Sequence, residues 1–82
     1  MPSEALLDRV REIAATIFNL PVEEITAESS PETIDTWDSM ATLTLTLELE
    51  QEFNIMISPE QSEQMKSVGA IAEGLAEMGV EA

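Results

Sequence analysis

The spacing of apolar residues over residues 3–19 constrains the fold of this chain more than any other feature. Apolar side chains recur there at intervals of three and four residues: Leu6, Val10, Ile13 and Ile17. That period places them on one face of an α-helix, with polar residues on the other face. Ser3 is a suitable N-cap, and a helix cannot continue through Pro21. The segment therefore predicts an amphipathic helix.

The length and composition agree with a small helical protein. The 82 residues have room for one hydrophobic core, so residues 1–82 are predicted to form a single domain. Of all residues 44% are hydrophobic but only 4% are aromatic, so the apolar mass is aliphatic. This composition favours helices over a β-sandwich.

Residues 20–38 are predicted to be a long ordered loop. Pro21, Pro31 and the pair Ser29-Ser30 interrupt regular structure. Apolar side chains are nevertheless spaced along it: Val22, Ile25, Ile34 and Trp37. These side chains would hold the loop on a core, and for Trp37 packing is favoured over contact with a partner. Long loops within compact domains usually serve a function.

Residues 40–53 are compatible with two structures. From Thr42 to Leu49 polar and apolar residues alternate with a period of two, which is typical of a half-buried strand. A helix would instead have two apolar faces, one with Leu45, Leu49 and Phe53, the other with Met40, Leu43 and Leu47. Good helix formers fill residues 48–52. The pattern alone leaves both structures open.

Two more helices are predicted after residue 57. Ser58 suits the N-cap of a short helix, with Pro59 at its first position and Gln61 completing a capping box. This helix should end near Met65. Ser67 suits the N-cap of a last helix, which Gly79 helps to end. One face of that helix is apolar: Val68, Ile71, Leu75 and Met78.

The charge balance limits the possible partners. Seventeen Asp and Glu residues stand against three Lys and Arg residues, which gives a formal net charge of −14. Such a chain repels nucleic acid and anionic membrane surfaces. It favours fast docking on basic patches of other proteins. We therefore expect protein partners with basic surfaces, no nucleic acid and no membrane, and a monomeric chain.

The chain contains neither cysteine nor histidine. Thiolate nucleophiles, Ser–His and Cys–His pairs and His-ligated metals are therefore excluded. No paired arrangement of carboxylates stands out, and the Asp spacing of a calcium-binding EF-hand is absent. We expect neither an enzyme nor a metal site. Because no signal peptide is recognisable at the N-terminus and no segment approaches membrane-spanning length, we expect a cytoplasmic location.

Ser39 has two interpretations. In the first it is only the N-cap of a helix, with Asp38 adding a favourable charge at the positive end of the helix dipole. In the second its hydroxyl carries a prosthetic group. A phosphate carried there would meet the free N–H groups of the helix N-terminus.

Four groups of residues, in this order within a small acidic chain, resemble the acyl carrier proteins. They are Val22-Glu23-Glu24-Ile25-Thr26 with Ser29, Trp37-Asp38-Ser39-Met40, Leu49-Glu50-Gln51-Glu52-Phe53-Asn54-Ile55, and Met65-Lys66-Ser67-Val68 with Ile71 and Leu75. The similarity spans about Leu6 to Leu75. It implies an all-α four-helix bundle of three longer helices and one short one. It also implies that residues 40–53 are helical, with Leu45, Leu49 and Phe53 in the core.

The resemblance implies a role for each residue around Ser39. A phosphopantetheinyl transferase would move 4′-phosphopantetheine from coenzyme A onto the Ser39 hydroxyl, and Asp38 would support this modification. Intermediates would then be carried as thioesters on the arm, and the carrier itself would catalyse nothing. Partner enzymes, such as acyl- or aminoacyl-loading ligases, synthases and transferases, would dock on an exposed face. The residues expected there are Met40, Leu43, Leu47, Glu50 and Asp35.

Some positions depart from the family pattern. Thr36 stands where a Gly is frequent, Met40 stands where a Leu is frequent, and Ala41 and Thr44 replace frequent acidic residues. The recognition face is thus less charged than in a typical fatty-acid carrier. Two alternatives stay open, which are an aminoacyl or peptidyl carrier and an unmodified acidic adaptor that docks through Leu43 and Leu47. The adaptor alternative predicts full binding by Ser39→Ala.

Overall fold

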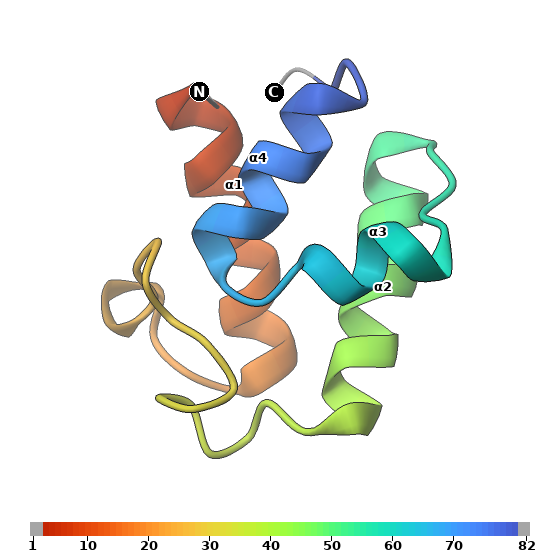
Figure 1. The fold of residues 1–82 in the computed structure, drawn as a ribbon. Helices are drawn as coiled ribbons and strands as arrows, with labels where there is room; N and C mark the ends of the chain where they lie inside the picture. The colour runs from red at the N-terminus through yellow and green to blue at the C-terminus, as the bar shows by residue number, and fades with distance from the viewer. Residues whose placement is uncertain (1–2, 81–82) are drawn as a thin grey trace.

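The chain folds into a bundle of four α-helices. The computed structural model describes residues 3–80, and within this range three helices are long, one is short and no strand is present (Figure 1). The α-helices are α1 (Glu4–Phe18), α2 (Ser39–Phe53), α3 (Pro59–Gln64) and α4 (Val68–Glu77). A single 3-10 turn, η1 (Val22–Glu24), lies in the long loop. The predicted all-α architecture is confirmed.

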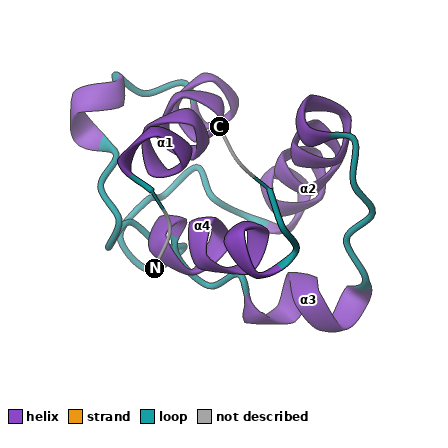
Figure 2. Ribbon diagram, turned by 90° about the horizontal axis from the view of Figure 1, so that it is seen from above, coloured by secondary structure: helices purple, strands orange, loops and turns teal. Residues whose placement is uncertain are grey.

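The helix α1 holds the bundle together, because it packs against both α2 and α4. The short helix α3 contacts α4, and the view from above shows it at the side of α4 away from α1 (Figure 2). The buried hydrophobic residues form one core. Its largest fully buried side chains are Phe18, Leu6, Ile25, Leu49, Ile71, Leu75, Val10 and Val68.

Local sequence signals set most helix ends. The Ser3 hydroxyl accepts a hydrogen bond from the N–H of Leu6 (3.1 Å) and caps α1, as predicted. The helix α1 ends at Phe18, three residues before Pro21, because Asn19 adopts a left-handed conformation with φ of 59°. The capping box at the start of α3 is present as predicted.

The alternating segment is helical, and its threonines are accommodated in a specific way. The hydroxyls of Thr42, Thr44 and Thr46 each donate to the carbonyl four residues earlier, at 2.9–3.0 Å. Each threonine hydroxyl on α2 therefore has an acceptor within its own helix or at its N-cap. Leu45 and Leu49 are buried as expected. Phe53, expected in the core, is only half-buried at the last position of α2 and packs on the rim of the core.

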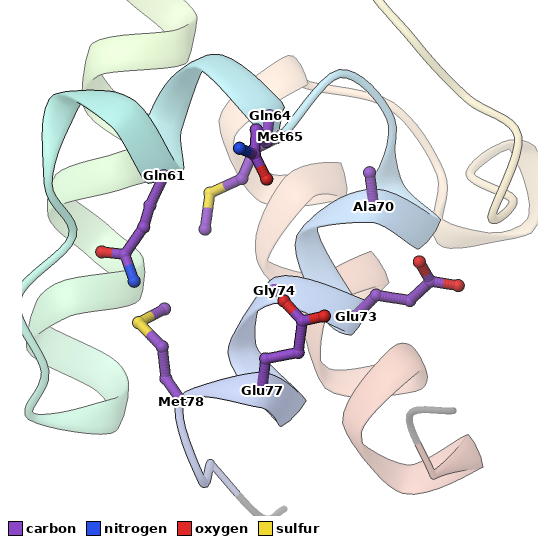
Figure 3. Close-up of a pocket in the computed structure, with 8 residues that line it drawn as sticks. All are labelled: Gln61, Gln64, Met65, Ala70, Glu73, Gly74, Glu77 and Met78. Atoms are coloured by element: carbon purple, nitrogen blue, oxygen red, sulfur yellow. The ribbon is translucent and has the colours of Figure 1, made fainter.

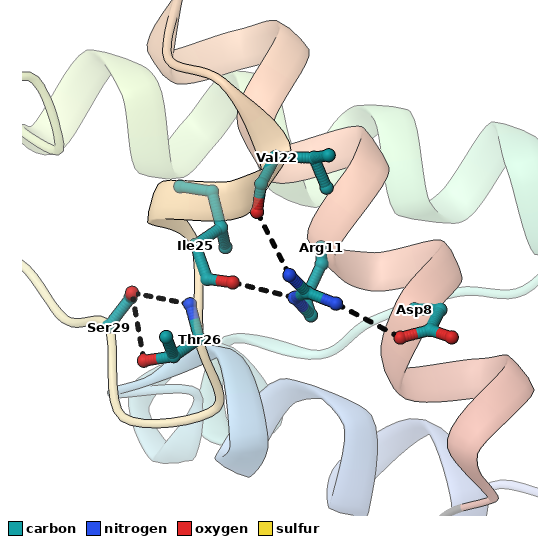
Figure 4. Close-up of polar contacts among 6 residues, drawn as sticks. All are labelled: Asp8, Arg11, Val22, Ile25, Thr26 and Ser29. Carbon is teal, nitrogen blue, oxygen red and sulfur yellow. Dashed lines mark hydrogen bonds and ion pairs between the residues drawn. The ribbon is translucent and has the colours of Figure 1, made fainter.

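Arg11 fastens the long loop to α1 (Figure 4). Its guanidinium donates to the carbonyl of Ile25 (2.6 Å), to the carbonyl of Val22 (3.0 Å) and to the carboxylate of Asp8 (3.1 Å). Ile25, farther along the loop, is buried as predicted, whereas Val22 is half-buried in the unpredicted 3-10 turn. The planar guanidinium thus satisfies the carbonyl of Ile25 and adds a second donor to the carbonyl of Val22, which already accepts the N–H of Ile25 (3.0 Å).

The same loop also caps the start of α4. The N–H of Val68 donates to the carbonyl of Ser29 (3.0 Å), and the N–H of Gly69 donates to the carbonyl of Ala27 (2.8 Å). The Ser67 hydroxyl accepts a hydrogen bond from the N–H of Ala70 (3.1 Å), as predicted for an N-cap. Three of the four N-terminal N–H groups of α4 are thereby satisfied by the chain itself.

An ion pair connects α1 and α2. Arg9 on α1 donates to Glu52 near the end of α2, with 2.8 Å between Nη2 and Oε2. The hydrogen bond to Glu52 raises the pKa of Arg9 above its ordinary value. Because the raised pKa lies far above neutrality, the stabilising effect is present at any working pH and is lost only in strong alkali. Both side chains are substantially exposed, so the pair contributes little to stability.

Candidate functional site

The N-terminus of α2 is capped by Asp38 and not by Ser39. The Asp38 carboxylate accepts a hydrogen bond from the N–H of Ala41 (2.8 Å), and the Asp38 backbone is extended, as is usual for an N-cap. Ser39 is therefore the first residue inside the helix. The interpretation of Ser39 as a helix cap is wrong, because Asp38 already performs that task.

The Ser39 hydroxyl is available for chemistry. Ser39 is exposed, and its hydroxyl has no hydrogen bond to any residue within 3–80. The N–H groups of Ser39 and Met40, which lack intrahelical partners by geometry, also have no acceptor in that range. An anion bonded to Ser39 would thus meet two unoccupied donors and the positive end of the helix dipole. The site fits a phosphodiester.

Trp37 lies immediately before the cap and belongs to the core. It is 4% exposed, and its ring stacks at a tilt on Phe18 with 4.8 Å between the ring centroids. The packing interpretation of Trp37 is confirmed. Ile34 is buried beside it, so the end of the long loop is anchored where it meets α2.

An apolar stripe on α2 begins next to Ser39. Met40 is 72% exposed, Leu43 56% and Leu47 50%, so all three predicted side chains face outward. We call these three residues the α2 stripe. Met56, in the loop after α2, is 88% exposed and was not predicted, because an isolated Met in a loop has no period to reveal it. Large exposed apolar side chains are a common feature of interaction surfaces.

The two acidic residues predicted for docking differ in their surroundings. Asp35 is exposed in the turn before Ser39. Glu50 is half-buried, and one of its carboxylate oxygens accepts a hydrogen bond from the N–H of Ile57 (2.8 Å). Glu50 therefore holds the loop between α2 and α3, a role that the sequence does not reveal. Glu48, one turn beyond Thr44, is exposed.

A cavity of about 240 Å³ lies apart from Ser39, between α3 and α4 (Figure 3). Met65 and Met78 point into it from opposite sides, and Gly74 leaves room beneath them. None of the site residues predicted from the sequence lines this cavity.

The described residues offer neither a metal site nor a membrane-spanning helix. Within residues 3–80 no three Asp or Glu side chains are grouped closely enough to hold a metal ion. None of the helices in that range has the length and hydropathy to cross a membrane.

Comparison with known proteins identifies the class. The family described as "Phosphopantetheine attachment site" matches residues 8–75. The acyl carrier protein of Streptomyces coelicolor is 40% identical, and the aligned region covers 94% of this chain and 89% of that protein. The acyl carrier protein of Enterococcus faecalis, known for high thermal stability, has a similar structure with a TM-score of 0.73 at 28% identity. That alignment covers 94% of this chain and 98% of the other.

The chain belongs to the acyl carrier protein family. It is a carrier and not an enzyme, and its cofactor is 4′-phosphopantetheine. As a family member it interacts with a phosphopantetheinyl transferase and with biosynthetic enzymes. The cofactor supplies the thiol on which an acyl group is carried, which a cysteine-free chain cannot supply itself.

Proposed function

We propose that Ser39 is the residue that carries 4′-phosphopantetheine. The observation that carries this proposal is that Asp38 caps α2, which leaves the exposed Ser39 hydroxyl without a structural task. In the modification, the Ser39 oxygen forms a bond to the phosphorus of coenzyme A that bears pantetheine, the pyrophosphate P–O bond breaks, and adenosine 3′,5′-bisphosphate leaves. The serine proton passes to a base of the transferase. The Ser39 and Met40 N–H groups then face the bound phosphodiester.

Asp38 supports this modification in two ways under the proposal. Its carboxylate fixes the start of α2 through Ala41. Its second oxygen has no partner within residues 3–80, so it is available to the transferase and its metal ion, as the family resemblance implies.

We also propose that the α2 stripe, defined by Met40, Leu43 and Leu47, is the docking face for the partner enzymes. All three side chains are exposed, and the first of them adjoins Ser39. Asp35 at one end of the stripe adds a contact for basic side chains. Glu50 contributes through its remaining carboxylate oxygen, because the other is engaged by Ile57. The partner surface is therefore apolar in the middle and basic at its edges.

The attachment site is tested by intact mass after incubation with coenzyme A and a broad-specificity transferase. The wild type should gain one phosphopantetheine, and Ser39→Ala should gain none while keeping its helical content, since no bond is lost. Ser62→Ala is the matched control, because Ser62 lies within α3 and its hydroxyl has no bond within residues 3–80. A wild type that is folded but never modified would refute the assignment and favour the adaptor alternative.

The docking face is tested with the modified protein and a loading enzyme. Leu43→Ser and Leu47→Ser should each raise KM for the carrier about tenfold, with little loss of kcat. Leu43→Ile and Leu47→Met, which keep an apolar side chain, should stay near the wild type. Loading with a fatty acyl, polyketide or aminoacyl group in the same assay would identify the cargo. Location in the cytoplasm and the monomeric state stay predictions.

A further inference from the structure

A chain of hydrogen bonds connects the buried Trp37 to the peptide that precedes Ser39. The Trp37 indole Nε1–H donates to the Thr42 hydroxyl (2.9 Å). The Thr42 hydroxyl donates in turn to the carbonyl oxygen of Asp38 (3.0 Å). A hydroxyl has one donor and two acceptor sites, so it performs both tasks at once.

The direction of this chain is fixed by chemistry. An indole N–H can only donate, and a backbone carbonyl can only accept, so the Thr42 proton must point at Asp38. The same carbonyl also accepts the N–H of Thr42 (2.9 Å). Two donors from one residue therefore hold the carbonyl of Asp38, and consecutive hydrogen bonds of one direction strengthen each other.

The Trp37 end of this series of hydrogen bonds is held by the core. Trp37 is stacked on Phe18 and is 4% exposed, and its backbone N–H donates to the carbonyl of Ile34 (3.1 Å). Beside it, the hydroxyl of Thr36 donates to the carbonyl of Phe18 (3.0 Å) at the end of α1. The segment that leads into α2 is thus fixed to α1 by a ring and a hydrogen bond.

Holding the Asp38 carbonyl also holds Ser39. The carbonyl of Asp38 and the N–H of Ser39 belong to one planar peptide unit, so fixing the oxygen fixes the plane from which the Ser39 side chain projects. Since Ser39 makes no side-chain hydrogen bond within residues 3–80, this plane is what sets the direction of its Cα–Cβ bond, and the hydroxyl turns about that bond.

We propose that Trp37 and Thr42 are positioning residues that orient Ser39 for transfer of the phosphopantetheinyl group. The inference rests on the proposed function of Ser39. A hydroxyl whose Cα–Cβ bond is held in one direction samples fewer positions and spends more of its time in the geometry that the transferase needs. Loss of this orientation should slow the chemical step and leave docking unchanged, because neither the indole nor the Thr42 hydroxyl is part of the α2 stripe.

The test compares variants that delete one hydrogen bond each. Trp37→Phe keeps a ring against Phe18 but loses the N–H, and Thr42→Val keeps the branched shape but loses the hydroxyl. Each should lower kcat for modification about fivefold, the rate equivalent of one neutral hydrogen bond, with KM unchanged. Thr42→Ser, which restores the hydroxyl, should restore the rate.

Thr46→Val is the matched control. Thr46 makes the same bond to the carbonyl four residues earlier (2.9 Å, to Thr42), one turn away from Ser39. It should lower stability like Thr42→Val but leave kcat unchanged. In addition, Thr42→Val should shift the NMR resonance of the sole indole N–H, and Thr46→Val should not.

The double variant decides whether the two residues act as one unit. If Trp37 acts through Thr42, Trp37→Phe combined with Thr42→Val should be no slower than Thr42→Val alone. Equal kcat for Thr42→Val and Thr46→Val, or additive losses in the double variant, would overturn the inference. A wild type that is never modified would instead refute the proposed attachment at Ser39. The two failures are distinguishable, because the positioning inference is overturned only by the kcat values of the variants.

Discussion

Gly69 and Gly74 lie on the same helix but meet different surroundings. A Cβ on Gly69 would lie 3.0 Å from the carbonyl oxygen of Ala27, which is held by the N–H of Gly69 itself. A Cβ on Gly74 would meet only the flexible end of Met65 at 3.5 Å, an ordinary contact. One glycine is therefore needed for close approach, and the other only weakens its helix.

The two Gly→Ala variants should change stability in opposite directions. Gly69→Ala should lower the free energy of unfolding by about 1–2 kcal/mol, because the backbone oxygen cannot move away without losing its hydrogen bond. Gly74→Ala should raise it by about 0.5–1 kcal/mol through helix propensity. Urea unfolding followed by circular dichroism measures both. A stabilised Gly69→Ala would contradict the close approach of the loop to α4.

Asp38 combines a cap and a charge, and two substitutions separate them. Asp38→Asn keeps the cap on Ala41, because Asn and Asp cap helices equally well, so the unfolding midpoint should stay near that of the wild type. Asp38→Ala should cost about 1 kcal/mol. Modification by the transferase should slow in both variants, since both remove the charge. Parallel unfolding and mass measurements check this, and full modification of Asp38→Asn would leave only the capping role.

At the scale of elements, α2 shows where sequence reasoning succeeds and where it does not. The alternation from Thr42 to Leu49 is ambiguous because a period of two is typical of a strand, and the family resemblance, not the pattern, indicated a helix. Helical geometry separated the two apolar faces, and the resemblance correctly assigned which face is buried and which is exposed, except that Phe53 is only half-buried. The capping residue of α2 was not identified from the sequence, because Asp38 and Ser39 are adjacent and both residue types are good N-caps.

The long loop after α1 depends on Arg11 for its attachment to that helix. Lysine has one compact charged group and cannot donate to Val22 and Ile25 in the planar arrangement seen here. Arg11→Lys should therefore lower the free energy of unfolding by about 1–2 kcal/mol and speed hydrogen exchange at residues 22–26. Arg9→Lys is the control, since its partner Glu52 is exposed, and it should leave exchange in the loop unchanged. Equal exchange in both variants would contradict the fastening role of Arg11.

At the scale of the whole molecule, the charge of −14 opposes folding. Two of the three basic residues, Arg9 and Arg11, are already engaged within the fold. Screening should therefore stabilise the protein, and raising KCl from 10 to 500 mM should raise Tm by about 5 °C. Thermal unfolding measures this. A variant with Glu23→Gln and Glu24→Gln should respond less to salt, and a Tm that falls with salt would contradict the prediction.

Local sequence patterns predicted α1, α3 and α4 and their approximate ends, because these depend on short-range periodicity and on side chains that cap their own helix. The helical state of residues 40–53 and the choice of Ser39 came from the family resemblance. Tertiary structure alone decided the tasks of residues whose partners are distant in the chain. Arg11 reaches the carbonyls of the loop, Ala27 caps α4, and Glu50 is engaged by Ile57. Such hydrogen bonds depend on how the loops lie against the helices, which no local pattern encodes. For the same reason, the separation of capping at Asp38 from chemistry at Ser39 became visible only in the fold.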